Sequence, residues 1–119
     1  MTKVSVVMPV YGQWDLVQRN IESLLKYDKP NLHEIIIVDD CSPDCNPTNI
    51  NHPLVKLIKN NTNLGYAGTV NNGLRLASSE IIILLDSDAY LISPIVKHLE
   101  EILKGDPTIG RLGFTSKGE

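Results

Sequence analysis

Two groups of acidic residues follow apolar segments of this 119-residue chain. Asp39 and Asp40 come directly after residues 34–38, and the triplet Asp86, Ser87 and Asp88 comes directly after residues 80–85. Two carboxylates about 5 Å apart repel by roughly 3 kcal/mol at an effective dielectric near 20. A divalent cation between two carboxylates makes their interaction energy favourable. Oxygen ligands suit Mg2+ or Mn2+, and proteins commonly hold these ions with one or two carboxylates together with substrate phosphates. The Asp-x-Asp spacing therefore predicts a metal site at residues 86–88, with the capping of a solvated turn as the alternative.

The segments that must position these residues alternate between predicted strands and predicted helices. Residues 35–38 and 81–85 are apolar at every position, which is typical of parallel strands covered on both faces. Further strands are predicted at residues 3–10, 54–58 and 109–115. Helices are predicted at residues 13–27 and 64–77, and a third helix from Ser93 as cap and Pro94 in the first turn. This alternation predicts an α/β fold with three layers, in which helices flank a mostly parallel, Rossmann-like sheet.

Open parallel sheets bind ligands beyond the carboxyl ends of their strands. The first predicted strand ends at Pro9, Val10 and Tyr11, so an aromatic ring joins the two acidic groups at one edge of the sheet. For Asp39 and Asp40 two roles stay open, a hydrogen bond to a base or ribose and the simple capping of a loop. We therefore expect a ligand site at this edge.

Composition excludes several classes of function. The chain has 11 Lys and Arg against 14 Asp and Glu, a net charge of −3, which argues against nucleic acid as a partner. Apolar residues make up 42% and charged residues 21%, as in ordinary globular domains and unlike disordered chains. The longest aliphatic run, residues 81–85, is too short for a membrane span. We expect a cytoplasmic protein whose membrane association, if any, is through partners, and free thiols at Cys41 and Cys45 rather than a local disulfide or metal ligands.

Other nucleotide-binding folds do not fit the motif positions. The segment after the first strand is Tyr-Gly-Gln-Trp-Asp, where a dinucleotide fold has Gly-x-Gly-x-x-Gly, and the sequence has no Walker Gly-Lys-Ser/Thr. The three histidines are scattered along the chain, and no Ser/His/Asp set can be assembled from them. These observations leave the two acidic groups as the best guide to function.

Four motifs, in order, resemble those of family 2 glycosyltransferases of the GT-A fold. They are Val4-Ser-Val-Val-Met-Pro-Val-Tyr11, Glu34-Ile-Ile-Ile-Val-Asp-Asp-Cys-Ser-Pro43, Asn63-Leu-Gly-Tyr-Ala-Gly68 with Asn71-Asn-Gly73, and Ile83-Leu-Leu-Asp-Ser-Asp88. They cover the chain from Lys3 to Phe114. The resemblance implies that the protein binds a nucleotide-diphosphate sugar with Mg2+ or Mn2+, the donor being UDP- or dTDP-linked in preference to GDP-linked.

The resemblance also implies roles for single residues. Tyr11 and the backbone of its two predecessors would flank the base, and Asp39 or Asp40 would hydrogen-bond the base or ribose. Asp88 would be the direct metal ligand, with Asp86 nearer the ribose and sugar and also available to the metal. The full substrate-binding set implied in this way is Pro9, Val10, Tyr11, Asp39, Asp40, Asn63, Gly65, Asn71, Asp86 and Ser87.

Two departures from the family pattern bear on activity. Many relatives carry a basic residue just before the motif's Asn71, where this chain has Thr69 and Val70. Arg75, one turn further on, could replace that cation, but a solvated helix face is the expectation we favour. Family members also continue into an acceptor-binding half with a catalytic carboxylate base and often a Gln-x-x-Arg-Trp motif, which this sequence lacks.

We therefore expect residues 1–119 to be the nucleotide-sugar-binding part of a glycosyltransferase domain, truncated after its fifth strand. The general base for transfer to a saccharide or other hydroxyl acceptor would lie outside this chain, and family membership would imply inversion. Apolar surface left uncovered would favour a homo-oligomer. The alternative is a nucleotide-binding α/β module without turnover.

Overall fold

The structure, a computed structural model, describes residues 3–44 and 50–105. Its strands are β1 (Val4–Val10), β2 (Leu32–Asp39), β3 (Val55–Lys59) and β4 (Ile82–Leu84). Its helices are α1 (Trp14–Asp28), the short 3-10 helix η1 (Lys29–Asn31), α2 (Gly65–Leu76) and α3 (Val96–Gly105). The predicted alternation of strands and helices is thereby confirmed. The strand predicted at residues 109–115 and the thiol of Cys45 lie outside the described residues.

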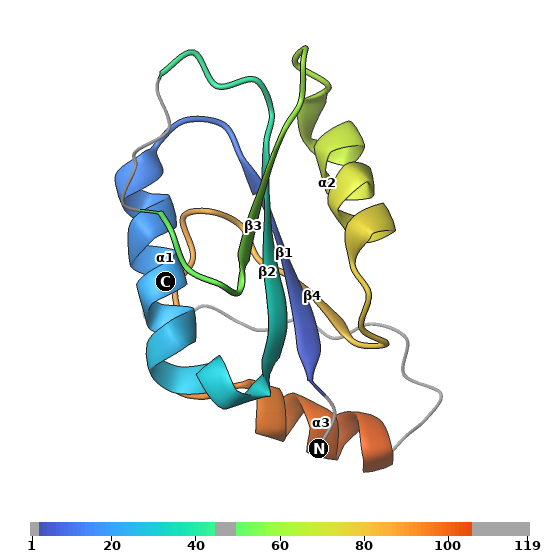
Figure 1. The fold of residues 1–119 in the computed structure, drawn as a ribbon. Coiled ribbons are helices and arrows are strands. Elements are labelled where there is room, and N and C mark those ends of the chain that lie inside the picture. Colours follow the sequence, from blue (N-terminus) through green and yellow to red (C-terminus); the bar gives the residue numbers. More distant parts are fainter. Residues whose placement is uncertain (1–2, 45–49, 106–119) are drawn as a thin grey trace.

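The four strands form one parallel sheet in the order β3-β2-β1-β4. Figure 1 shows α1 against one face of this sheet and α2 against the other, which confirms the three-layer α/β architecture. The chain moves from β1 outward through β2 and β3, and then returns to place β4 on the other side of β1. The strand order therefore reverses between β1 and β4, and in open α/β sheets ligands bind at such a switch point.

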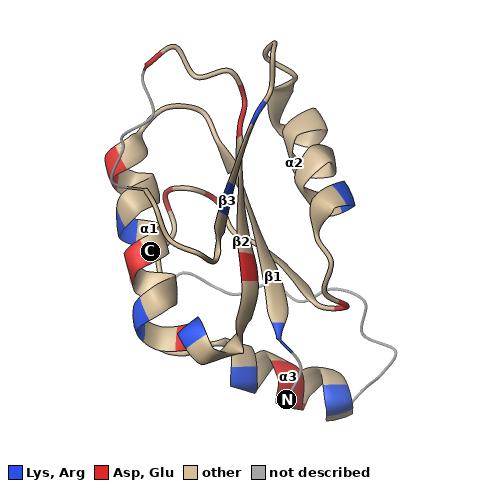
Figure 2. Ribbon diagram, in the orientation of Figure 1, with Lys and Arg blue, Asp and Glu red and all other residues tan. Residues whose placement is uncertain are grey.

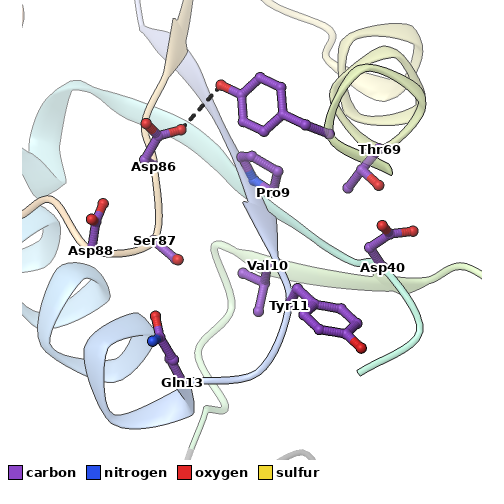
Figure 3. A pocket seen from close by; sticks show the side chains of 10 residues that line it. Pro9, Val10, Tyr11, Gln13, Asp40, Thr69, Asp86, Ser87 and Asp88 are labelled. Atoms are coloured by element: carbon purple, nitrogen blue, oxygen red, sulfur yellow. Dashed lines mark hydrogen bonds between the residues drawn. The ribbon is translucent and has the colours of Figure 1, made fainter. Parts of the chain in front are cut away.

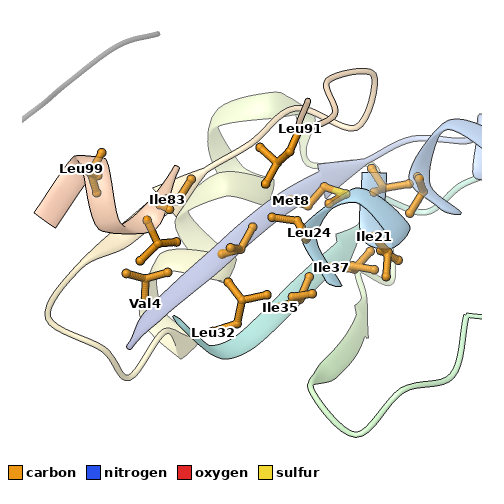
Figure 4. Packing of buried hydrophobic residues seen from close by; sticks show 14 of the residues in the cluster. Val4, Met8, Ile21, Leu24, Leu32, Ile35, Ile37, Ile83, Leu91 and Leu99 are labelled. Carbon is orange, nitrogen blue, oxygen red and sulfur yellow. The ribbon is translucent and has the colours of Figure 1, made fainter. Parts of the chain in front are cut away.

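Most of the hydrophobic core lies between the sheet and α1. Trp14, Val17, Ile21 and Leu24 recur at helical spacing on α1 and are all buried. They pack with inward-facing residues of β1 and β2, and α3 closes the same core through Val96 and Leu99 (Figure 4). This packing fixes α1 firmly against the two central strands.

On the opposite face, α2 approaches the sheet very closely at Gly73. A Cβ atom added there would lie 2.4 Å from Val7 Cγ1 and 3.2 Å from Val38 Cγ2. A glycine inside a helix costs about 1 kcal/mol relative to alanine. The glycine that weakens α2 as a helix is thus the residue that lets α2 lie against β1 and β2.

The prediction of a strand over residues 81–85 covered on both faces is wrong for β4. The strand is only three residues long, and Ile82 and Leu84 are 37% and 44% exposed. Only Ile83 joins the core. The reason is tertiary: β4 is at the edge of the sheet among the described strands, and α2 packs over β1 and β2 instead.

The predicted start of the third helix is also wrong. α3 begins at Val96, so Ser93 is not its cap and Pro94 is not in its first turn. The carboxylate of Asp28, at the end of α1, instead accepts hydrogen bonds from the N–H groups of Ile95 (2.9 Å) and Val96 (3.3 Å). A carboxylate from a neighbouring helix thus satisfies the free N–H groups that a local serine was expected to satisfy.

Charged residues are interspersed over the described elements. Figure 2 shows acidic and basic residues alternating along α1 and α3. Among the described residues, no helix is both long enough and apolar enough to cross a membrane.

Candidate functional site

A pocket of about 340 Å³ opens at the carboxyl ends of β1 and β4. This volume is within the range of small-molecule sites. Figure 3 shows residues 86–88 on one side, Asp40 and Thr69 across from them, and the end of β1 between. The lining residues are Pro9, Val10, Tyr11, Gln13, Asp40, Tyr66, Thr69, Asp86, Ser87 and Asp88. The structure thus brings the end of the first strand and the Asp-x-Asp triplet together, as the sequence predicted.

The acidic triplet forms a turn directly after β4. The N–H of Ala89 donates to the carbonyl of Asp86 over 3.1 Å, and Asp86 Oδ1 accepts a hydrogen bond from the hydroxyl of Tyr66 over 3.1 Å. Asp86 and Asp88 are both exposed at the pocket. Their carboxylates can therefore take up a further ligand without breaking a buried network.

The oxygen donors of this turn suit Mg2+ or Mn2+. Asp86, Ser87 and Asp88 offer two carboxylates and a hydroxyl on one wall of the pocket. No group of three or more His, Cys, Asp or Glu side chains that could hold a metal ion occurs within residues 3–44 and 50–105. A metal here would thus need further oxygens from a bound phosphate, which is the usual arrangement for Mg2+.

Asp40 caps α2 and faces the pocket at the same time. Its Oδ1 accepts from the N–H of Leu64 (2.7 Å) and from Asn60 Nδ2 (3.0 Å), and its Oδ2 accepts from the N–H of Gly65 (3.0 Å). Burial opposes ionisation, but these hydrogen bonds and one from Thr69 outweigh it and hold the pKa of Asp40 below its ordinary value. Of the two roles left open for this residue, loop capping is visible here, and contact with a base or ribose stays a prediction.

Asp39 is buried and holds the loop that follows β2. Its Oδ1 accepts hydrogen bonds from both the N–H (2.9 Å) and the hydroxyl of Ser42. Ser42 Oγ in turn accepts from the N–H of Gly12 over 2.8 Å. This chain of contacts ties the end of β2 to the loop after β1, and Asp39 is not among the residues that line the pocket.

The loop between β1 and α1 turns sharply at the pocket. Gly12 and Gln13 have φ values of 68° and 54°, in the left-handed region that a non-glycine residue such as Gln13 rarely adopts. Tyr11, just before this turn, is 57% exposed and lines the pocket. Its ring is therefore free to stack on a flat ligand.

Besides Asp39, three further predicted substrate residues, Asn63, Gly65 and Asn71, lie outside the pocket lining. Asn63 Oδ1 accepts a hydrogen bond from the N–H of Gly65 over 3.1 Å, so this pair shapes the start of α2. Arg75 is exposed and donates to Asn72 Oδ1 over 2.9 Å, as expected for a solvated helix face.

Three lining residues, Gln13, Tyr66 and Thr69, were not predicted. Tyr66 and Thr69 are three residues apart on α2, one helical turn, and so share the face that meets the pocket. That spacing was a usable signal in the sequence. Gln13 reaches the pocket through its own left-handed backbone, with a φ of 54°, which a glutamine does not signal in a sequence.

The chain is similar to proteins of one family over nearly its whole length. Residues 5–115 match the model of glycosyl transferase family 2. The poly(ribitol-phosphate) beta-glucosyltransferase of Bacillus spizizenii is 32% identical over 127 residues, which cover 98% of this chain and 20% of that protein. The poly(ribitol-phosphate) beta-N-acetylglucosaminyltransferase TarP of Staphylococcus aureus is 34% identical over 128 residues, or 99% of this chain and 39% of that protein. The chain thus spans only a fifth to two fifths of the length of these relatives.

Solved structures show the same fold. The mannosyltransferase PcManGT from Pyrobaculum calidifontis, in complex with GDP-Man and Mn2+, matches with a TM-score of 0.78 and 27% identity, covering 92% of this chain and 34% of that one. The S. aureus TarS 1–349 structure in complex with UDP matches with a TM-score of 0.75 at 24% identity, covering 96% of this chain and 38% of that one. Because the family model spans residues 5–115 and both structures match more than nine tenths of the chain, the chain belongs to glycosyl transferase family 2 and has the GT-A fold.

Proposed function

We propose that this chain binds a nucleotide-diphosphate sugar together with Mg2+ or Mn2+ for glycosyl transfer to an acceptor hydroxyl. The observation that carries the proposal is the charge of the pocket. Three carboxylates line it, those of Asp40, Asp86 and Asp88, beside the exposed ring of Tyr11, and none of the described lining residues is a lysine or arginine. Such a wall repels a diphosphate unless a cation lies between them.

In this proposal, some residues that line the pocket bind the metal and others bind the nucleoside. In this proposal Asp88 is the direct metal ligand, and Asp86, held by the hydroxyl of Tyr66, lies nearer the ribose and sugar. A base stacked on Tyr11 would gain about 1–3 kcal/mol. Asp40 lines the pocket, but its four hydrogen bonds already use about all the acceptor positions of an ionised carboxylate. A bond from a base or ribose would therefore replace or share one of these bonds.

The bound cation would supply charge neutralisation to the leaving nucleoside diphosphate. The chain's own part is to hold that diphosphate on residues 86–88 and to orient the base against Tyr11. We propose a UDP- or dTDP-linked donor. The TarS complex holds UDP and the mannosyltransferase complex holds GDP-Man, so competition between UDP and GDP for the pocket tests this choice.

Calorimetry with UDP in the presence and absence of Mn2+ tests the site. We expect binding that requires Mn2+ and falls at least 10-fold in Asp88→Ala, because that substitution removes a ligand of the cation. Glu101→Ala is the matched control, since it removes an exposed carboxylate on α3. UDP binding that is indifferent to Mn2+, or equal in the two variants, would contradict the proposal.

The alternative function is a nucleotide-binding module without turnover. Because the chain spans only part of its relatives' length, we propose that the general base for an inverting transfer is not among its residues. An assay of donor turnover with added hydroxyl acceptors separates the two functions. Robust transfer by the 119-residue chain would show that it carries its own base.

We further propose that the chain self-associates through β4, which is at the edge of the sheet among the described strands. Ile82 and Leu84 are 37% and 44% exposed on this edge strand, and exposed apolar strands favour association. Sedimentation velocity over a range of concentrations should show an oligomer that Leu84→Ser weakens. A wild-type chain that stays monomeric at the highest concentration would contradict this expectation.

A further inference from the structure

The loop of residues 86–91, which carries the acidic triplet, is anchored mainly by α1. β4 pairs with β1 through only three residues, and the hydrogen bond from the N–H of Leu85 to the carbonyl of Val7, 3.0 Å, is the last to the sheet before the triplet begins. Beyond this point, the backbone of the loop bonds to side chains on one face of α1. The sheet therefore brings the loop to the pocket, but other residues must hold it there.

Asn20 anchors the first residue of this loop. Its side chain is completely buried, and its Nδ2 donates to the backbone carbonyl of Asp86 over 2.9 Å. Its Oδ1 is also buried and has no hydrogen-bond partner among the described residues. A buried polar atom without a partner costs about 1–3 kcal/mol. Packing alone would favour an apolar residue here, so the bond to Asp86 is what distinguishes this asparagine.

Ser23 anchors the last residue of the loop. It lies three residues after Asn20, one turn further along the same face of α1, and is 8% exposed. Its hydroxyl donates to the carbonyl of Asn20 over 2.7 Å and accepts from the N–H of Leu91 over 2.9 Å. Tyr90 is part of the loop between the two anchored residues, and its ring centre lies 4.2 Å from the guanidinium carbon of Arg19 on α1.

We propose that Asn20 and Ser23, here called the α1 clasp, are positioning residues that fix residues 86–91 so that Asp86 and Asp88 face the pocket. This inference rests on the proposed function of that pocket as a metal and nucleotide site. Neither clasp residue lines the pocket, so the clasp acts through the backbone of the loop. A loop that is already ordered loses less conformational freedom on binding, and residues that orient metal ligands typically change metal affinity 10- to 100-fold.

Substitutions in α1 test the clasp. Asn20→Leu removes the donor to Asp86 and the unpartnered Oδ1 together, and it keeps the number of heavy side-chain atoms and the branch at Cγ. Ser23→Ala removes the acceptor for the N–H of Leu91, whereas Ser23→Thr keeps a hydroxyl and serves as the rescue. Glu22→Ala is the matched control, because Glu22 is an exposed residue on the same helix that bonds Gln18 and not the loop.

Three measurements are made on each variant. Paramagnetic resonance of Mn2+ with UDP reports metal affinity, amide hydrogen exchange of Leu91 without metal reports loop order, and thermal unfolding reports global stability. We expect Asn20→Leu and Ser23→Ala to bind Mn2+ with UDP 10- to 100-fold more weakly. Their loop amides should exchange faster while the melting temperature changes little, and Ser23→Thr should recover near wild-type affinity.

These measurements distinguish a failure of the clasp proposal from a failure of the proposed metal and nucleotide site. A wild-type chain that does not bind Mn2+ with UDP overturns the proposed function, and exchange at Leu91 then decides alone whether the clasp orders the loop. Wild-type affinity in both Asn20→Leu and Ser23→Ala overturns the clasp, as does unchanged exchange of Leu91. If Ser23→Ala fails to fold, Asn20→Leu gives the decision, because it leaves no new unpaired group in the core.

Discussion

Glu34, near one end of the sheet, and Asp86 and Asp88, at the other, are carboxylates in opposite environments. Near the amino ends of the strands, Glu34 is 1% exposed and receives hydrogen bonds from Ser5 (2.6 Å), Lys56 (2.6 Å), and both the N–H (2.8 Å) and hydroxyl (2.9 Å) of Ser78. Burial alone would raise its pKa, but the bonds from Lys56, Ser5 and Ser78 outweigh that effect and lower the pKa to about 2. Glu34 therefore joins three strands and the segment after α2 into one network.

At the carboxyl ends, Asp86 and Asp88 are exposed and keep acceptor positions for a ligand. The side chain of Asp86 accepts a hydrogen bond from the exposed Tyr66, where Glu34 is surrounded by four donors. The same functional group is thus structural where donors saturate it and available for a cation where they do not. Asp40 lies between these extremes, since it is saturated enough to cap α2 and yet lines the pocket.

Among substitutions that test this contrast between buried and exposed carboxylates, we expect Glu34→Gln to change stability most. The substitution keeps the shape but replaces one accepting oxygen by an amide donor and removes the charge facing Lys56. We expect a loss of stability on the order of 2 kcal/mol at neutral pH, after allowing for solvent around Lys56, which is 58% exposed. Urea unfolding at pH 7 measures it.

The pH dependence of stability tests whether the ionised carboxylate of Glu34 causes this stabilisation. Because the folded pKa of Glu34, about 2, is below its ordinary value of 4.5, its contribution is complete above pH 4.5 and is lost as the pH falls from 4.5 towards 2. Glu34→Gln should flatten this part of the stability profile. Lys56→Gln is the control and should cost less, since its ammonium group is largely in water; an equal or greater cost would contradict the assignment.

The smallest effect is expected at the other end of the sheet. In the absence of metal, Asp86→Asn and Asp88→Asn should each change the free energy of unfolding by no more than about 0.5 kcal/mol, because both side chains are exposed. Removing one of two neighbouring negative charges relieves repulsion and favours a small gain. Urea unfolding without divalent ions checks this, and a loss comparable to that of Glu34→Gln would remove the contrast between the two ends.

Much of the fold could be predicted because its signals are local. The apolar run of β2 and the stripe Trp14, Val17, Ile21 and Leu24 each reveal an element's type and buried face. The acidic triplet could be placed at a strand end for the same reason. The predictions that were wrong concern features that depend on residues distant in the chain. Among the described helices, α2 packs over β1 and β2 and leaves Ile82 and Leu84 of β4 exposed, and the start of α3 is capped by Asp28 from another helix.

By itself, the sequence determined the order of strands and helices, the parallel sheet and the meeting of Tyr11 with residues 86–88 at one edge. These follow from hydrophobic periodicity and from the rule that parallel strands end together. Only the tertiary structure decided which carboxylates are saturated and which stay open, and that Asn20 and Ser23 hold the acidic loop. The number of donors around a carboxylate depends on residues that are distant in the chain, so hydrophobic periodicity does not encode it.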